Sequence, residues 1–192
     1  MPTQSRRERA REERRELILR TARELAETDG WDAVTTRRLA EAVDYSQPVL
    51  YGHFKNMNAI ADAVAVQGIE EMTAVLRKAR ETGGLRALAH AYLDYAADHP
   101  AVYEAMFVRP TALSFGTPDS PAALKSAFDQ FIAAVEPSAG ADPETLAEVL
   151  WSSLHGQATL NRTNRLRPTH VRARADLLVG RLSGNNSSLT AE

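Results

Sequence analysis

The chain of 192 residues contains no cysteine and no apolar run long enough to cross a membrane. Without cysteine it cannot have a disulfide framework, a thiolate metal site or a cysteine nucleophile. A membrane-spanning helix needs about 18 consecutive apolar residues. The N-terminal segment MPTQSRRERAREERRE has no apolar stretch after its arginines, so it does not fit a secretory signal. We therefore expect a soluble, cytoplasmic protein.

Sequence motifs of catalysis are also missing. The chain has no Gly-x-Ser-x-Gly, no phosphate-cradling loop and no glycine-rich dinucleotide turn. His90 and Asp94 are four residues apart and could share a helix face as metal ligands do, but no third ligand is marked. Solvated helix residues explain that pair better. We predict no catalytic residue, no metal and no cofactor.

The net charge is only −2, but charge is unevenly distributed along the chain. Residues 1–23 hold eight arginines against four glutamates, whereas residues 61–160 hold six basic and thirteen acidic side chains. A basic end joined to an acidic middle suggests that one end meets a polyanion. The alternative for RRERAREERRE is a solvated helical extension with Glu–Arg pairs at helical spacing.

Apolar residues recur at helical spacing in almost every segment, and no segment favours a strand. Gly30 follows a predicted helix end, Thr35 and Ser46 are predicted N-caps, and Asp142-Pro143 is a helix start signal. The expected helices cover residues 14–28, 36–43, 47 to an end near 52–55, 58 to about 82, 85–98, 100–107, 122–135, 143 to about 162 and about 168 to 182. The sequence predicts an all-α protein.

Two of these helices, within TTRRLAEAVDYSQPVLYGHF at residues 35–54, are too short to be stable alone, because isolated helices under about 12 residues are marginal in water. A three-helix core around Ile18, Leu25, Leu39 and Leu50 would support them. The turn between them needs a residue that tolerates a positive φ, and Asp44 can serve. This spacing indicates a helix-turn-helix.

The second short helix would then expose polar side chains that suit reading of a major groove. Gln47, Tyr51 and His53 are predicted to face outward. The full predicted DNA contact set is Thr36, Arg37, Ser46, Gln47, Pro48, Tyr51, His53 and Lys55. The alternative is a small helical corner with ordinary polar exposure.

The sequence around these two helices is similar to that of a known protein family. The run 14–60 resembles the N-terminal domain of the tetracycline-repressor (TetR) family of bacterial transcription regulators. The features that match are the helix end at Asp29-Gly30, Thr35-Thr36, Leu39-Ala40 and the pattern Leu50-Tyr51-x-His53-Phe54. Asp44-Tyr45, Gly52 and Met57 depart from that family's usual residues, which leaves the operator sequence open. The resemblance implies a dimeric DNA-binding regulator.

The later part of the chain is similar to one branch of this family with a Trp-x-x-x-His-Gly signature, here Trp151-Ser-Ser-Leu-His155-Gly156. The segment YLDYAADHPAVYEAMF is also similar to that branch. The resemblance implies a part that binds a small effector and holds two subunits together. Aromatic residues are core by default, but the resemblance marks Tyr92, Tyr103, Phe107, Phe128, Trp151 and His155 as an expected effector pocket.

A seam for helix–helix packing supports the dimer independently. Val171, Ala175, Leu178 and Leu182 are spaced 4, 3 and 4 apart in the last helix, and the preceding helix carries Leu150 and Leu154 beside small residues. Two such helices from each subunit would form a four-helix interface. The alternative is packing within one chain only.

The predicted organisation is a basic N-terminal arm (1–13), a helix-turn-helix DNA-binding domain (14–60), a ligand-binding and dimerisation domain (61–183) and a disordered tail (184–192). We predict a repressor that binds a palindromic operator as a homodimer and is released by a small, largely apolar effector. Two alternatives stay open: a helical protein or enzyme that kept the fold without regulated DNA binding, and a DNA-binding scaffold without an effector.

Overall fold

The protein is described by a computed structural model covering residues 6–138, 140 and 142–184. This part of the chain contains eight α-helices and no strand, which confirms the all-α prediction. The helices are α1 (Arg6–Asp29), α2 (Thr36–Ala42), α3 (Gln47–His53), α4 (Met57–Asp98), α5 (Pro100–Phe107), α6 (Ala122–Val135), α7 (Pro143–Arg162) and α8 (Val171–Gly184). No helix in the described ranges is long and apolar enough to cross a membrane.

The chain forms two compact units. The first comprises Met1–Gly68 with Ala101–Ala112, and the second comprises Ile69–Pro100 with Leu113–Glu192. Helix α4 belongs to both, because the division falls between Gly68 and Ile69 rather than between residues 60 and 61. The predicted functional boundary at residue 60 stays a prediction.

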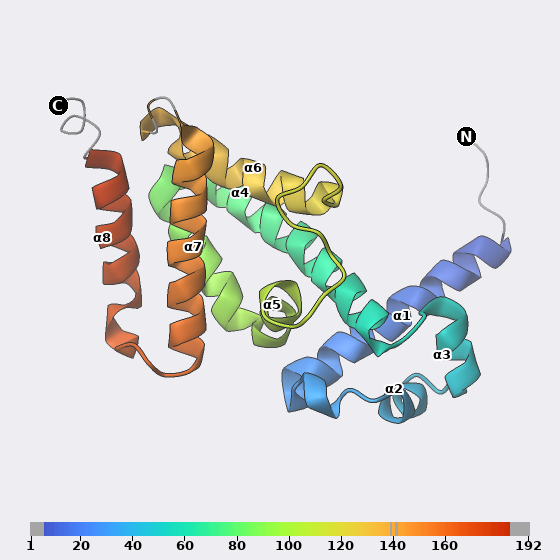
Figure 1. Ribbon diagram of the computed structural model, residues 1–192. Coiled ribbons are helices and arrows are strands. Elements are labelled where there is room, and N and C mark those ends of the chain that lie inside the picture. The colour runs from blue at the N-terminus through green and yellow to red at the C-terminus, as the bar shows by residue number, and fades with distance from the viewer. Residues whose placement is uncertain (1–5, 139, 141, 185–192) are drawn as a thin grey trace. The chain divides into compact units, whose positions relative to one another are not determined.

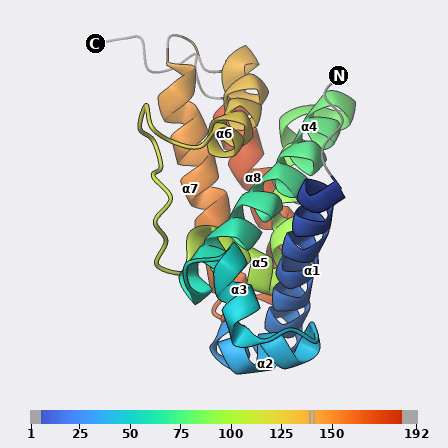
Figure 2. The ribbon, with the colours of Figure 1, turned by 90° about the vertical axis from the view of Figure 1, so that its right-hand side faces the viewer.

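The core of the first unit lies among α1, α2 and α3, which Figure 2 shows grouped together. Ile18, Leu39 and Leu50 are at most 2 % exposed, as expected for the predicted three-helix core, while Leu25 is only half-buried. The two short helices are stable because they share this core.

Helix α5 is attached to the first unit by contacts that the sequence did not indicate. The Glu27 carboxylate accepts hydrogen bonds from the backbone N–H groups of Ala101 (3.0 Å) and Val102 (3.1 Å), in the first turn of α5. The indole N–H of Trp31 donates to the Ala101 carbonyl at 2.7 Å. Amides of a helix's first turn have no partner within the helix, so a carboxylate there both satisfies them and complements the helix dipole.

The second unit contains the later part of α4 with α6, α7 and α8, and Figure 1 shows α7 and α8 running side by side. Within α4, Gly83 and Gly84 have non-helical backbone angles, and Gly84 has a φ of 62°. This confirms the predicted helix break there. Tyr92 of α4 is fully buried and packs edge-on against Phe131 of α6.

Polar and charged side chains of α4 and α8 pair with one another in the second unit. His90 Nε2 lies 2.8 Å from Asp176 Oδ1, and Arg86 reaches the same carboxylate at 3.3 Å. Asp94 accepts hydrogen bonds from Arg172 at 2.7 and 2.8 Å. His90 and Asp94 are therefore not simply solvated, as the sequence suggested, because each is paired with a side chain of α8.

Helix ends follow the predicted signals in part. Thr35 and Asp142 accept hydrogen bonds from the amides of Arg38 and Thr145, as N-caps should. Ser46 occupies the N-cap position of α3, but its side chain makes no capping hydrogen bond. Helix α1 begins at Arg6, eight residues before the expected start, so residues 6–13 are helical. Residues 1–5 and 185–192, which include almost all of the predicted tail, lie outside the described residues.

Candidate nucleic-acid interface

The turn between α2 and α3 is built around Asp44. Asp44 has a φ of 55°, a left-handed conformation that aspartate tolerates better than most side chains. Its amide donates to the carbonyl of Glu41, and the Tyr45 amide donates to that of Ala40 at 3.0 Å. These two bonds form a Schellman motif, which satisfies carbonyls that the end of α2 would leave unpaired. The predicted role of Asp44 in the turn is confirmed.

Helix α3 buries one side and exposes the other. Leu50 is 2 % exposed and holds α3 to the core, whereas Tyr51 is 53 % exposed and Gln47 is exposed at the first turn. Pro48 stands in the first turn, where its missing N–H has no intrahelical partner to lose. The exposed face therefore presents an amide and a phenol beside a helix N-terminus, groups that bind base edges and phosphates.

Three other members of the predicted DNA contact set, Thr36, Arg37 and Lys55, lie outside α3. Thr36 Oγ1 and Tyr51 Oη lie 3.3 Å apart, which ties the start of α2 to α3. Arg37 forms an ion pair with Glu41 at 2.9 Å, so its charge is partly offset in the free protein. Lys55 is exposed just after α3.

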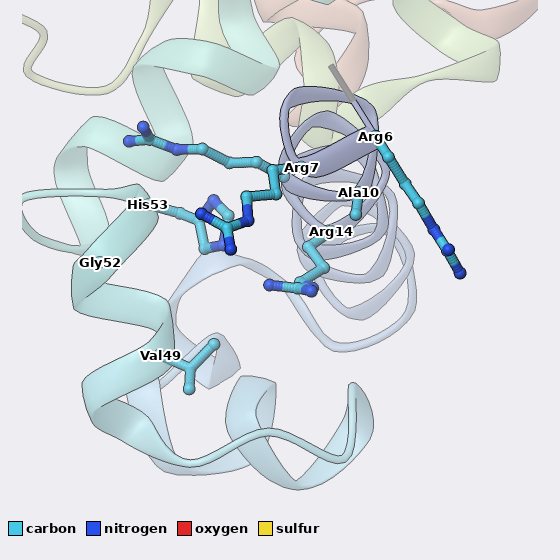
Figure 3. Close-up of a pocket in the computed structure, with 8 residues that line it drawn as sticks. Arg6, Arg7, Ala10, Arg14, Val49, Gly52 and His53 are labelled. Atoms are coloured by element: carbon cyan, nitrogen blue, oxygen red, sulfur yellow. The ribbon is translucent and has the colours of Figure 1, made fainter.

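His53 is not turned outward with Gln47 and Tyr51. It is half-buried and lines a hollow between α3 and α1 (Figure 3). Burial, followed by the positive charges of Arg11 and Arg14, lowers the pKa of His53 below its usual value. The side chain therefore faces the arginines of α1. At about 100° per residue, His53 lies about 200° round α3 from Tyr51, so helical spacing itself places it off the face that Gln47 and Tyr51 share.

The residues of the expected effector pocket lie in both units. Tyr92, Phe128, Trp151 and His155 belong to the second unit, whereas Tyr103 and Phe107 belong to α5 in the first. On α7 the Trp151 and His155 rings have centroids 5.9 Å apart. Burial lowers the pKa of His155, so this ring is neutral at pH 7.

The residues of the expected dimer seam face largely into the chain. Leu150, Leu154 and Ala175 are fully buried, and Val171, Leu178 and Leu182 are half-buried. Fully buried side chains offer no surface to a partner. The exposed apolar side chains of these two helices are others: Val149 and Leu160 on α7, and Leu177 on α8.

Taken together, the all-helical fold and the exposed α3 define a helix-turn-helix DNA-binding protein. Comparisons with known proteins identify the family. Residues 18–64 match the description "Bacterial regulatory proteins, tetR family", and residues 85–182 match "Tetracyclin repressor-like, C-terminal domain". The chain belongs to the TetR family of transcriptional regulators, and it is a DNA-binding transcriptional regulator.

Individual relatives support this assignment over different lengths. An uncharacterized HTH-type transcriptional regulator of Mycobacterium tuberculosis is 32% identical over 157 residues, covering 78% of this chain and 70% of that protein. The class C tetracycline repressor protein of Escherichia coli is 53% identical over 51 residues, but these cover only 27% of this chain and 23% of the repressor. The solved structure of a TetR-family regulator from Pectobacterium atrosepticum matches in fold, with a TM-score of 0.68, 22% identity and coverage of 93% and 94% of the two chains.

Sequence reasoning missed two features of the first unit. The Glu27 carboxylate that caps α5 had no local signal, because the two partners are more than 70 residues apart in the chain. The hollow between α1 and α3 did have a signal, because Arg7, Arg11 and Arg14 recur at helical spacing and therefore share one face of α1.

Proposed function

We propose that this regulator is a repressor that binds a palindromic operator as a homodimer in the cytoplasm and is released by a small effector. The observation that carries the proposal is the exposed polar face of α3. The Schellman turn before α3 and the buried Leu50 fix the helix so that this face points to solvent. The similarity of a 51-residue stretch of this chain to the class C tetracycline repressor protein favours repression as the sign of regulation.

The dimer is proposed to form through the outer faces of α7 and α8. Val149, Gly156 and Leu160 share one face of α7 at spacings of 7 and 4. Ala173, Leu177, Gly180 and Gly184 share one face of α8 at spacings of 4, 3 and 4, and all are exposed in the single chain. Added Cβ atoms at Gly156 and Gly180 would meet nothing within 4 Å, so these faces are open for close helix approach. A second copy of the chain is the occupant that buries both faces.

The effector is proposed to bind in the second unit, near Tyr92, Phe128, Trp151 and His155. Aromatic walls with a few polar atoms suit a small, largely apolar ligand. Helix α4 runs from this unit into the first, so a ligand that favours one position of α4 shifts DNA affinity. The shift equals the difference in ligand affinity between the two arrangements, typically about 1–3 kcal/mol.

A gel-shift assay with the DNA flanking the protein's own gene tests this function. Saturable binding to a fragment that contains a palindrome is expected, with much weaker binding to a scrambled duplex of equal length. Equal affinity for the two duplexes would contradict the proposed function and would favour a helical protein without regulated DNA binding. Specific binding that no candidate small molecule releases would describe a DNA-binding scaffold without an effector.

Two substitutions distinguish contacts to bases from contacts to the DNA backbone. Gln47→Ala should change base preference at one operator position, because each lost bidentate contact to a base is worth about 1–3 kcal/mol. Lys55→Ala should weaken binding to every sequence alike and lower the slope of log affinity against log salt by about one. Fluorescence anisotropy on a set of single-base operator variants measures both. If Gln47→Ala keeps affinity and preference, α3 is not the reading helix.

A further inference from the structure

The N-terminal extension of α1 separates its charges by face. Arg7, Arg11 and Arg14 recur at spacings of 4 and 3, which places them on one face of the helix together with Ala10. At about 100° per residue, Glu8, Glu12, Glu13 and Glu16 all fall outside this face. No ion pair joins these three arginines to any described residue. The mixed sequence thus folds into a helix with one purely basic face.

This basic face forms one wall of a hollow whose other wall is α3. The hollow has a volume of about 760 Å³ and is lined by Arg6, Arg7, Ala10, Arg11, Arg14, Val49, Gly52 and His53. Figure 3 shows Arg14 extending toward the side of α3 and Arg6 pointing away from it, so Arg6 lies at the rim. A Cβ at Gly52 would meet nothing within 4 Å, and the bare backbone keeps the α3 wall open.

The electrostatics of this hollow favour an anion. His53 has its pKa lowered by burial and by Arg11, Arg14 and Arg15, with Glu12 opposing. Like charges close together in the free protein repel one another, and an anion between them offsets that repulsion. The His53 imidazole adds a hydrogen-bonding group beside the arginines of α1.

A second hollow, beside the helix-turn-helix turn, shows the contrast. It is lined by Arg37, Ala40, Glu41, Asp44, Tyr45, Ser46 and Gln47. Arg37 is its one basic residue, and Glu41 pairs with that guanidinium at 2.9 Å. Two carboxylates against one arginine make this hollow a poor anion site. Of the two hollows, the one between α1 and α3 has the charge that a phosphate requires.

We propose that Arg7, Arg11, Arg14 and His53 form a seat for the sugar–phosphate backbone of the same duplex that α3 reads, held in place by the rigid helical extension of α1. The proposal rests on DNA binding through α3. Val49, Gly52 and His53 line the hollow from a side of α3 that is turned from Gln47 and Tyr51, so the seat would hold a phosphate beside the groove that α3 reads and not a base within it. Guanidinium groups bind phosphate oxygens in a fork, and contacts of this kind fix the register of a protein on DNA without reading its sequence.

Single substitutions of these arginines test the seat through salt dependence. Arg7→Ala, Arg11→Ala and Arg14→Ala should each lower the slope of log affinity against log salt by about one, for the gene-flanking fragment and for a random 30-base-pair duplex alike. Arg9→Ala and Arg20→Ala are matched controls: both are exposed arginines of α1 outside the hollow, and both should keep the wild-type slope. If hollow and control arginines lower the slope equally, the proposed seat is wrong, and the arginines act only through the overall charge of α1.

Ala10→Pro tests whether the rigid helix places the charge. Proline is tolerated in a first helical turn but not further in. The helix should therefore restart at position 10, which retains Arg11 and Arg14 and releases Arg7. Every charge is kept, yet the slope should fall by about one. A wild-type slope would show that a flexible basic arm suffices and would contradict the proposal.

Two other results of these measurements bear on the seat. If the wild-type protein binds the gene-flanking fragment and the random duplex equally, the proposed function fails, but the salt slopes on both duplexes still test the seat. If inorganic phosphate alone binds saturably by calorimetry, and the arginine variants abolish that binding while keeping the DNA slope, the seat serves a free anion and the DNA assignment fails.

Discussion

Leu177→Glu is expected to convert the protein from a dimer into a folded monomer. Leu177 is 63 % exposed in the single chain. A glutamate at this position stays in water in the monomer, so its carboxylate has no desolvation cost there. In the proposed dimer the same side chain is buried against the partner, and an unpaired carboxylate in such a place costs several kcal/mol. Sedimentation velocity should show the change in mass, and circular dichroism should show unchanged helix content.

Loss of the dimer should remove operator binding almost entirely. Two reading helices must reach half-sites about 34–36 Å apart, one turn of DNA. Linking two sites raises affinity by about 10²–10⁴ over one site alone, and the monomer loses that gain. The gel shift of the palindromic fragment should therefore disappear at concentrations that saturate the wild type.

Ser183→Glu is the matched control for this experiment. It adds the same charge to an exposed position of α8 but lies off the face that carries Leu177. It should sediment and bind as the wild type does. If Leu177→Glu remains a dimer with full affinity, the interface lies on another surface. A wild-type monomer in solution would contradict the dimer proposal itself.

The sequence predicts those features of the fold that depend on a few neighbouring residues. Thr35 and Asp142 cap helices through atoms three residues away, Asp44 tolerates the left-handed turn, and Gly83-Gly84 interrupts α4. Each of these depends on the chemistry of one or two residues, so a single sequence predicts it. The order and type of the helices follow from such signals and from apolar periodicity.

Periodicity does not say what covers an apolar face. Helix α8 has two such faces, one through Ala175 and Leu178 and one through Ala173 and Leu177, and both have helical spacing. The sequence favoured the first as the dimer seam, but in the structure that face is the more buried one within the chain. Which face packs on α7 is decided by tertiary fit, and the sequence carries no direct record of it.

Gly68→Ala is expected to lower the free energy of unfolding, although alanine is the better helix former. A Cβ at Gly68 of α4 would lie 2.3 Å from Val102 Cγ1 and 2.9 Å from Met106 Sδ of α5. Both neighbours are fully buried, and Val102 is β-branched and stiff, so it cannot swing away. Overpacking costs about 1–3 kcal/mol, which exceeds or cancels the gain of about 1 kcal/mol in helix propensity.

Helix α5 cannot relieve this clash by sliding. The Glu27 carboxylate holds its first turn at 3.0 and 3.1 Å, and the Trp31 indole holds the carbonyl of Ala101 at 2.7 Å. Movement of α5 would break bonds to buried or half-buried groups, at about 1–3 kcal/mol for each group left unsatisfied. The strain from the added methyl group therefore stays between α4 and α5, and Gly68 is the residue that lets the two helices approach.

Thermal unfolding with a second-site variant decides whether the clash is the cause. For a chain of this size each kcal/mol moves Tm by about 2–4 °C. Gly52→Ala, where the added methyl group meets nothing within 4 Å, should instead leave Tm unchanged or raise it. Val102→Ala removes the clashing methyl group, so Gly68→Ala should cost less in that background than in the wild type. A Gly68→Ala protein that melts like Gly52→Ala would mean that α5 does not sit on α4 at Gly68, because helix propensity alone would then set the outcome.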